Sequence, residues 1–267
     1  MSKTIRLLLL TGGLALAFTI YIVDAVKTSE TTKETTGEAV ESEDSRSKHH
    51  FGTLTDDRDG KTYKTVQIGS QTWMAENLNY FPCDGMWDDW EWNSTACYND
   101  DSANCEKYGR LYTWAFAMDS AAYFSEGGKG CGDGKMCSPT YLVRGVCPEG
   151  WHLPSDAEWM TLEEFVASSL GYPDGEGDAL KSASGWKENY NGKPGNGSDA
   201  FGFGALPAGY RYFGFKDVLE KAYFWSSTEC GANDAYFRSL YYYGTGLRSA
   251  GNSYKDKALS VRCVKDP

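Results

Sequence analysis

Residues 155–171 show the pattern of a helix that packs against a core. Ser155 and Glu158 stand at the S-x-x-E spacing of a capping box, in which each side chain bonds to the backbone N–H group of the other residue. Gly171 is suited to the left-handed conformation that often ends a helix. Apolar residues three or four positions apart mark one face of the segment: Trp159, Leu162, Val166 and Leu170. The pattern predicts a helix over residues 156–170.

Two earlier segments also have a regular pattern. Alternation through Tyr63, Val66 and Ile68, followed by Gly69-Ser70 and residues 71–74, predicts a β-hairpin. In residues 109–124 (GRLYTWAFAMDSAAYF) apolar positions recur at helical spacing, which predicts a first helix. These positions are Leu111, Trp114, Ala115, Met118, Ala121 and Ala122.

The second half of the chain has short apolar segments separated by Gly, Asn and Pro, among them AYFWSSTE and AYFRSLYYY. Such segments are typical of strands and long loops. Two helices between an opening hairpin and a strand-rich second half indicate an α+β domain with antiparallel sheets. Thirty glycines and eighteen tyrosines agree with a loop-rich fold whose loops are fixed by aromatic packing.

The N-terminus has the pattern of an export signal. Lys3 and Arg6 precede an apolar stretch over 7–23, and cleavage is expected after Ala25. The stretch is also close to the minimum length of a membrane span, so an uncleaved anchor is the alternative. Residues 26–52 are rich in Thr, Ser and Glu and predict a disordered linker. The folded domain is therefore expected over 53–267, in the periplasm, on the cell surface or outside the cell.

Charge and metal-ligand content exclude several classes of function. The formal net charge of −11 disfavours nucleic acids and anionic membrane surfaces, so membrane contact is expected only through an uncleaved N-terminal segment. The chain has no C-x-x-C motif and three histidines, so zinc binding is not predicted. The acidic run Asp56–Gly60 lacks an EF-hand pattern, because Thr55 and Val66 occupy the first and twelfth loop positions. We expect no metal and no cofactor.

Eight cysteines in an exported chain predict disulfides. Cys97 and Cys105 flank one short loop and Cys131 and Cys137 flank another, so we expect both pairs to close locally.

Cys147 and His152 admit a catalytic interpretation as a nucleophile and its base. The capping box directly after them favours a structural one. We expect His152 to be largely buried and to have no catalytic role.

Two aromatic segments are candidates for ligand binding. Exposed indole and phenol rings stack on sugar rings, while carboxylates accept hydrogen bonds from sugar hydroxyls. The alternative is that these rings fill the core of a loop-rich fold. The candidate residues are Trp87, Asp88, Asp89, Trp90, Glu91 and Trp92 in one segment, and Tyr241, Tyr242 and Tyr243 in the other.

Six motifs, in this order, resemble the Fibrobacter succinogenes major paralogous domain, a module of exported bacterial proteins: TVQIGSQTWMAENLNY, YGRLYTWAFAM, CPEGWHLPSDAEW, FGFGALPAGYR, FWSSTE and SVRCVKD. The resemblance covers about Leu54–Asp266. That family is similar to the C-type-lectin-like fold, in the branch that includes formylglycine-generating enzymes. It therefore implies a C-type-lectin-like α+β domain with two helices, antiparallel sheets and long loops pinned by disulfides.

The resemblance also implies contacts between distant segments. It pairs Cys147 with Cys263, which leaves Cys83 and Cys230 to pair with each other. Because domains of this type bring their ends together, the strand at Tyr63–Ile68 is expected to pair with the terminal strand Leu259–Val264.

Two departures from the related families limit the function that the resemblance implies. Residues 238–258 contain no cysteine, so the copper-dependent chemistry of formylglycine-generating enzymes is not expected. The sugar-binding tripeptides of calcium-dependent lectins (E-P-N, Q-P-D and W-N-D) are absent as well. The favoured hypothesis is an exported, non-catalytic binding module for a glycan or a surface protein. A passive envelope component and a carboxylate-dependent glycan-acting enzyme are the alternatives.

Overall fold

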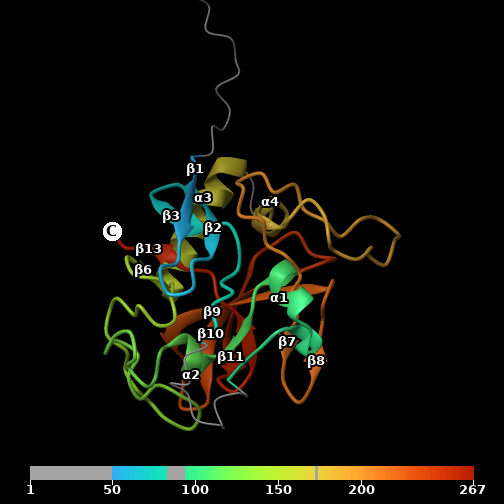
Figure 1. Cartoon of the computed structure of the whole chain (residues 1–267). Coiled ribbons are helices and arrows are strands. Elements are labelled where there is room, and N and C mark those ends of the chain that lie inside the picture. The colour runs from blue at the N-terminus through green and yellow to red at the C-terminus, as the bar shows by residue number, and fades with distance from the viewer. Residues whose placement is uncertain (1–49, 83–93, 172–173) are drawn as a thin grey trace, which may run out of the picture. The chain divides into compact units, whose positions relative to one another are not determined.

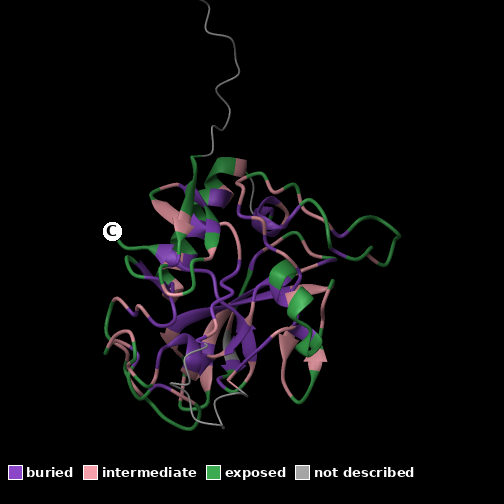
Figure 2. Cartoon of the chain, viewed as in Figure 1, coloured by how far each residue is buried: buried purple, intermediate pink, exposed green. Residues whose placement is uncertain are grey.

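The computed structural model describes residues 50–82, 94–171 and 174–267, which lie in one unit of the chain, Arg46–Pro267 (Figure 1). The unit is α+β, as predicted, and its strands form two sheets. Buried residues lie in the strands of both sheets and also in the helices and loops packed against them (Figure 2). None of the helices in the described ranges has the length and apolar character needed to cross a membrane.

The first sheet has five strands in the order β1-β2-β3-β13-β6. Their bounds are Phe51–Thr55 (β1), Thr62–Ile68 (β2), Gln71–Met74 (β3), Val264–Lys265 (β13) and Trp151–His152 (β6). The predicted hairpin is confirmed as β2 and β3, with Ile68 opposite Gln71. The sheet begins earlier than expected, because Phe51 and Gly52 pair with Val66 and Thr65 instead of belonging to the linker.

The predicted pairing of the terminal strand with Tyr63–Ile68 is wrong. β1 and β3 already occupy the two edges of β2, so the chain end joins the sheet at the free edge of β3, with Val264 opposite Trp73. The segment Leu259–Val264 is also divided between the sheets, because Ala258–Ser260 forms β12 of the second sheet.

The second sheet has the order β11-β10-β9-β12-β5-β4, and β7 and β8 form a small hairpin beside β12. All its pairings are antiparallel except that of β12 with β9. The strands are Thr95–Ala96 (β4), Leu111–Thr113 (β5), Tyr210–Arg211 (β7), Phe215–Lys216 (β8), Lys221–Glu229 (β9), Asp234–Tyr241 (β10), Arg248–Tyr254 (β11) and Ala258–Ser260 (β12).

The helix α3, Asp156–Leu170, is confirmed at both ends. Both hydrogen bonds of the Ser155–Glu158 capping box are present, and Gly171 adopts the left-handed conformation with φ 73°. The helix buries Trp159, which lies 4.6 Å from Trp73 between ring centroids. This contact attaches α3 to the first sheet.

The other predicted helix, over 109–124, is largely wrong. Leu111–Thr113 forms β5 between β12 and β4, and only Trp114–Ala117 is helical (α2). The chain then turns, because the buried carboxylate of Asp119 accepts hydrogen bonds from the backbone N–H groups of Tyr123, Phe124 and Ser125. The described residues contain four α-helices instead of two, the others being Ser102–Tyr108 (α1) and Glu176–Leu180 (α4).

Three disulfides are formed as expected: Cys97–Cys105, Cys131–Cys137 and Cys147–Cys263. Cys230 is exposed and shares no disulfide with a described residue. Its predicted partner, Cys83, lies outside the described residues, so that pair stays a prediction.

Candidate functional site

Tyr241, Tyr242 and Tyr243 lie where β10 ends, and the structure brings Tyr190 to them from the loop after α4. This loop projects to the right in Figure 1. The ring centroid of Tyr190 lies 5.5 Å from that of Tyr242 and 5.8 Å from that of Tyr243. Tyr243 lies 5.4 Å from Tyr241, so the four rings form one cluster, which we call the tyrosine platform.

The four rings differ in exposure. Tyr190 is 83% exposed and Tyr243 45%, whereas Tyr241 is half-buried and Tyr242 is buried. A hydrogen bond with Tyr190, together with burial, raises the pKa of Tyr242 to about 12. Tyr242 is therefore the buried ring on which the platform packs, and Tyr190 and Tyr243 are the rings exposed to solvent.

Buried Lys181 holds the two loops of the platform together. Its ammonium group donates to the carbonyl oxygen of Gly195 at 2.9 Å and to that of Gly244 at 3.1 Å, one in each loop. Gly195 is needed for the close approach, because a Cβ atom there would lie 2.2 Å from the Lys187 carbonyl oxygen and 2.7 Å from that of Tyr242. These contacts fix the position of Tyr190 relative to Tyr243.

Cationic side chains border the platform. Lys187 lies 4.7 Å from the Tyr242 ring centroid and forms a 2.6 Å ion pair with Glu220. The guanidinium of Arg248 lies 5.1 Å from the Tyr241 ring centroid. The platform thus combines aromatic surface with donors at its edge, which suits ligands that have both apolar faces and oxygen acceptors.

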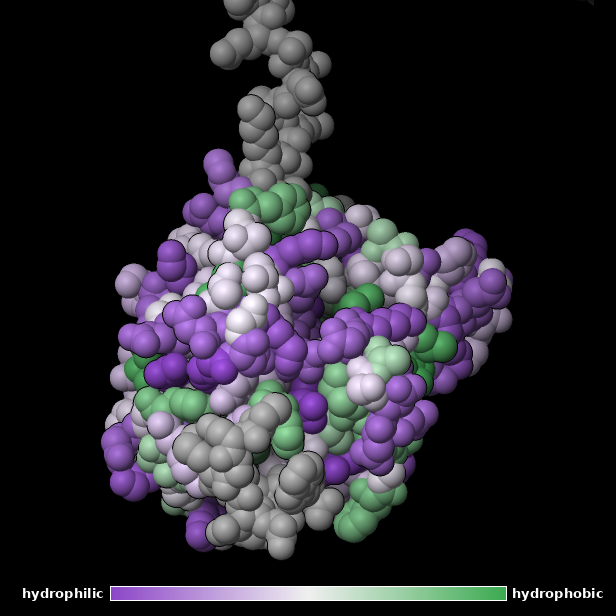
Figure 3. All heavy atoms as spheres, viewed as in Figure 1, coloured by the Kyte–Doolittle hydropathy of each residue, from purple (hydrophilic) through white to green (hydrophobic). Residues whose placement is uncertain are grey.

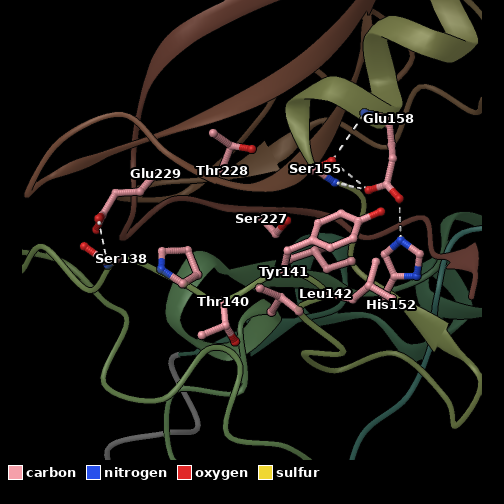
Figure 4. A pocket seen from close by; sticks show the side chains of 13 residues that line it. Ser138, Thr140, Tyr141, Leu142, His152, Ser155, Glu158, Ser227, Thr228 and Glu229 are labelled. Atoms are coloured by element: carbon pink, nitrogen blue, oxygen red, sulfur yellow. Dashed lines mark hydrogen bonds and ion pairs between the residues drawn. The ribbon is translucent and has the colours of Figure 1, made fainter.

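The second feature is a pocket of about 370 Å³ between residues 138–143, the start of α3 and the end of β9 (Figure 4). Its lining includes the hydroxyls of Thr140, Ser155, Ser227 and Thr228 and the carboxylates of Glu158 and Glu229.

His152 lies in the wall of this pocket and is 2% exposed, as predicted. Its Nε2 lies 2.7 Å from Glu158 Oε1 and its Nδ1 lies 2.8 Å from Asp266 Oδ1. The other oxygen of Glu158 accepts from the backbone N–H and the hydroxyl of Ser155. Both ring nitrogens are therefore engaged with carboxylates, and the imidazole joins the start of α3 to the segment after β13.

The His152 pKa is set by opposing effects. Burial by itself lowers it, but the hydrogen bonds with Glu158 and Asp266 outweigh burial, so the pKa is raised above its usual value. For Glu158, burial favours the neutral acid, but His152 and Ser155 outweigh it and lower the pKa. The arrangement is an imidazole ring held between two carboxylates, which favour its protonated form.

We expect this arrangement to make stability depend on pH. Because folding raises the His152 pKa, its stabilisation is complete below the unfolded value of about 6.5 and is lost as pH rises through the folded value. The lowered Glu158 pKa gives stability that is present above about 4.3 and lost at lower pH. In urea titrations the free energy of unfolding should fall as pH rises above about 6.5. His152→Ala should remove that fall, and an unchanged fall in the variant would contradict the assignment.

The comparison with protein families agrees with the resemblance seen in the sequence. Residues 66–265 match the family model of the Fibrobacter succinogenes major domain. The chain belongs to this family. No curated protein and no solved structure matches the chain significantly. The C-type-lectin-like part of the fold therefore stays a prediction.

Within this Fibrobacter succinogenes major domain, the structure describes only part of the predicted ligand site, and that site stays a prediction. Trp87, Asp88, Asp89, Trp90, Glu91 and Trp92 lie outside the described residues. No group of three or more potential metal-ligating His, Cys, Asp or Glu side chains occurs within the described ranges. Sequence reasoning missed Tyr190, although the Gly- and Asn-rich segment NYNGKPGNG around it marked an exposed loop.

Proposed function

We propose that this chain is an exported, non-catalytic binding module that contacts polysaccharide through the tyrosine platform. The observation that carries the proposal is the pair of exposed rings, Tyr190 and Tyr243. Their centroids lie 5.8 Å apart, and both rings pack on buried Tyr242. Three disulfides support export, because disulfides persist in oxidising compartments.

The chemistry of the platform favours a glycan over an apolar partner. A sugar ring has an apolar face that stacks on phenol rings and hydroxyl groups that accept from Lys187 and Arg248 at the edge. On the face seen in Figure 3, hydrophilic residues predominate and hydrophobic residues form separate small groups. Large continuous apolar patches are the usual mark of protein interfaces.

The carboxylates of the pocket support a non-catalytic role. Glu158 is engaged by His152 and Ser155. Glu229 accepts from Lys255 and from the backbone N–H groups of Cys137 and Ser138. A general acid or a glycosidase nucleophile needs a carboxyl group free to reach the substrate.

Replacing Tyr190 with Ala should remove most of the binding to soluble polysaccharides. The ring is 83% exposed, so its loss leaves the core intact but removes the more exposed stacking surface. Loss of one stacking contact of about 1.5 kcal/mol corresponds to roughly a tenfold weaker affinity. The measurement is affinity electrophoresis or calorimetric titration with xylan, cellulose derivatives and pectin.

Phe213→Ala is the matched control, because Phe213 is 91% exposed and lies outside the platform. Equal weakening by both variants would indicate nonspecific adsorption to exposed rings. If no polysaccharide binds and the chain instead retains a surface protein in a manner that depends on Tyr190, the glycan proposal is wrong and the protein partner replaces it.

A further inference from the structure

The hydroxyl of Ser227 has no hydrogen-bond partner in the described part of the chain, and solvent reaches it although most of the residue is buried. The residue is 6% exposed, and its backbone N–H donates to the Pro154 carbonyl oxygen. Its side chain lines the pocket, where Figure 4 places it in the middle of the labelled residues. In solution such a hydroxyl bonds to water, which a ligand group can replace. A molecule in the pocket can therefore donate to the hydroxyl or accept from it.

Further hydroxyls reach the same pocket from two sides. Thr140 and Tyr141, on the loop side, have hydroxyl groups without a partner among the described residues, and Tyr141 is 78% exposed. On the β9 side, Thr228 Oγ1 accepts from the Asp156 backbone N–H at 2.9 Å, which leaves its own hydrogen to donate. The pocket therefore offers several groups that each donate or accept, without a fixed charge on any of them.

The charged groups of the pocket disfavour an anionic ligand. Glu158 and Glu229 line it, whereas the cation that neutralises Glu229, Lys255, is 1% exposed and does not line the pocket. The imidazole of His152, which is a cation when protonated, has both nitrogens bonded to carboxylates. An anion would therefore face two carboxylates and no free cation. A cation would meet carboxylates that already have partners, so an uncharged ligand fits best.

The volume of the pocket and its apolar lining restrict the class of ligand that fits it. The volume of about 370 Å³ is at the low end of the range for small-molecule sites, about 300–1,000 Å³. Pro139, Leu142, Val143 and Leu153 add apolar surface to the lining beside its hydroxyls. A single sugar ring presents both kinds of surface, and the exposed ring of Tyr141 is available to stack on it.

We propose that this pocket binds one uncharged sugar unit through the hydroxyls of Ser227, Thr140 and Tyr141. The pocket and the tyrosine platform share no residue. The inference therefore goes beyond the proposed function, because it adds a second site that recognises a terminal or single sugar while the platform contacts a polymer surface.

The test uses the full chain and individual sugars. Saturation-transfer NMR and calorimetry with D-glucose, D-galactose, D-mannose, D-xylose and N-acetyl-D-glucosamine should show binding of at least one, with a dissociation constant on the order of 1 mM. D-glucuronate should not bind, because its carboxylate would face Glu158 and Glu229. Absence of binding by all the neutral sugars at about 20 mM would overturn the proposal, as would stronger binding of glucuronate.

Variants locate the bound sugar. Ser227→Ala and Thr140→Val each remove one hydroxyl and should weaken binding about tenfold. Thr140 is exposed, so its variant tests the site without affecting the core. Ser125→Ala is the control for loss of an unpartnered hydroxyl, since the hydroxyl of Ser125 has no partner and Ser125 does not line the pocket. Unchanged affinity in both Ser227→Ala and Thr140→Val would refute the site.

The platform variant separates the two proposals. Tyr190→Ala should leave sugar binding in the pocket unchanged, and Ser227→Ala should leave polysaccharide binding unchanged. If Tyr190→Ala abolishes binding of the single sugar and Ser227→Ala does not, the sugar lies on the platform and the pocket proposal fails while the proposed function stands. If polysaccharide binding is absent but a single sugar binds in a manner that depends on Ser227, the proposed function fails and the pocket proposal stands.

Discussion

Replacing Cys147 and Cys263 with Ala should lower the free energy of unfolding by about 5 kcal/mol, the largest effect that we expect from any single cross-link. The two cysteines are 116 residues apart, and the chain-entropy model gives a larger stabilisation for a longer loop. The bond also joins the loop before β6 to the segment that leads into β13, next to it in the first sheet. Because domains are stable by only about 5–15 kcal/mol, the variant should unfold at much lower denaturant.

Cys131→Ala with Cys137→Ala is the control for loop length. That disulfide has a sequence separation of 6, for which the same model gives about 2 kcal/mol. Urea unfolding of the two double variants under identical non-reducing conditions gives the comparison. Equal losses would show that local packing at the sulfurs, and not the length of the closed loop, determines the stabilisation.

The elements predicted correctly from the sequence were those whose signals are local. The capping box of α3, its apolar face and Gly171 lie within 17 consecutive residues, so a short stretch of chain specifies both ends of the helix. The hairpin of β2 and β3 and the two short-range disulfides are local in the same sense. The bond between Cys147 and Cys263 was predicted only through the family resemblance, since spacing alone does not select among pairings.

The helix predicted over 109–124 failed because tertiary contacts determine the structure of that segment. Leu111–Thr113 is a strand since β12 and β4 pair with it on both sides, and neither partner is visible in the local pattern. The carboxylate of Asp119 then ends the short helix by accepting hydrogen bonds from three backbone N–H groups. The sequence alone does not distinguish this role from that of a solvated carboxylate.

The candidate sites were less predictable than the fold, because each is assembled from separate loops. The tyrosine triplet was visible in the sequence, but Tyr190 is 51 residues from Tyr241 and reaches it through contacts of Lys181. The pocket combines residues 138–143, the start of α3 and the end of β9. Neither the exposure of Tyr190 nor the missing partner of the Ser227 hydroxyl could be deduced before these segments were positioned.

Replacing Arg262 with Met should lower the free energy of unfolding by about 3–5 kcal/mol. Arg262 lies between β12 and β13, where the chain passes from the second sheet to the first, and it is 0% exposed. Its guanidinium donates to the Asn77 side-chain oxygen at 2.7 Å and 3.0 Å and to the carbonyl oxygens of Met74 and Phe203. Methionine fills a similar volume but leaves these buried acceptors without a donor.

Burial lowers the Arg262 pKa to about 9, so the side chain is still charged at neutral pH. The charge is held by carbonyl and amide oxygens and by the rings of Phe203 and Phe224, 4.4 Å and 5.4 Å away. Arg262→Lys should therefore recover only part of the stability, because an ammonium has three donors and cannot span the same acceptors. Arg248→Met is the exposed control and should change stability by no more than about 0.5 kcal/mol. Equal unfolding midpoints for Arg262→Met and Arg248→Met would mean that the buried guanidinium does not hold the two sheets together.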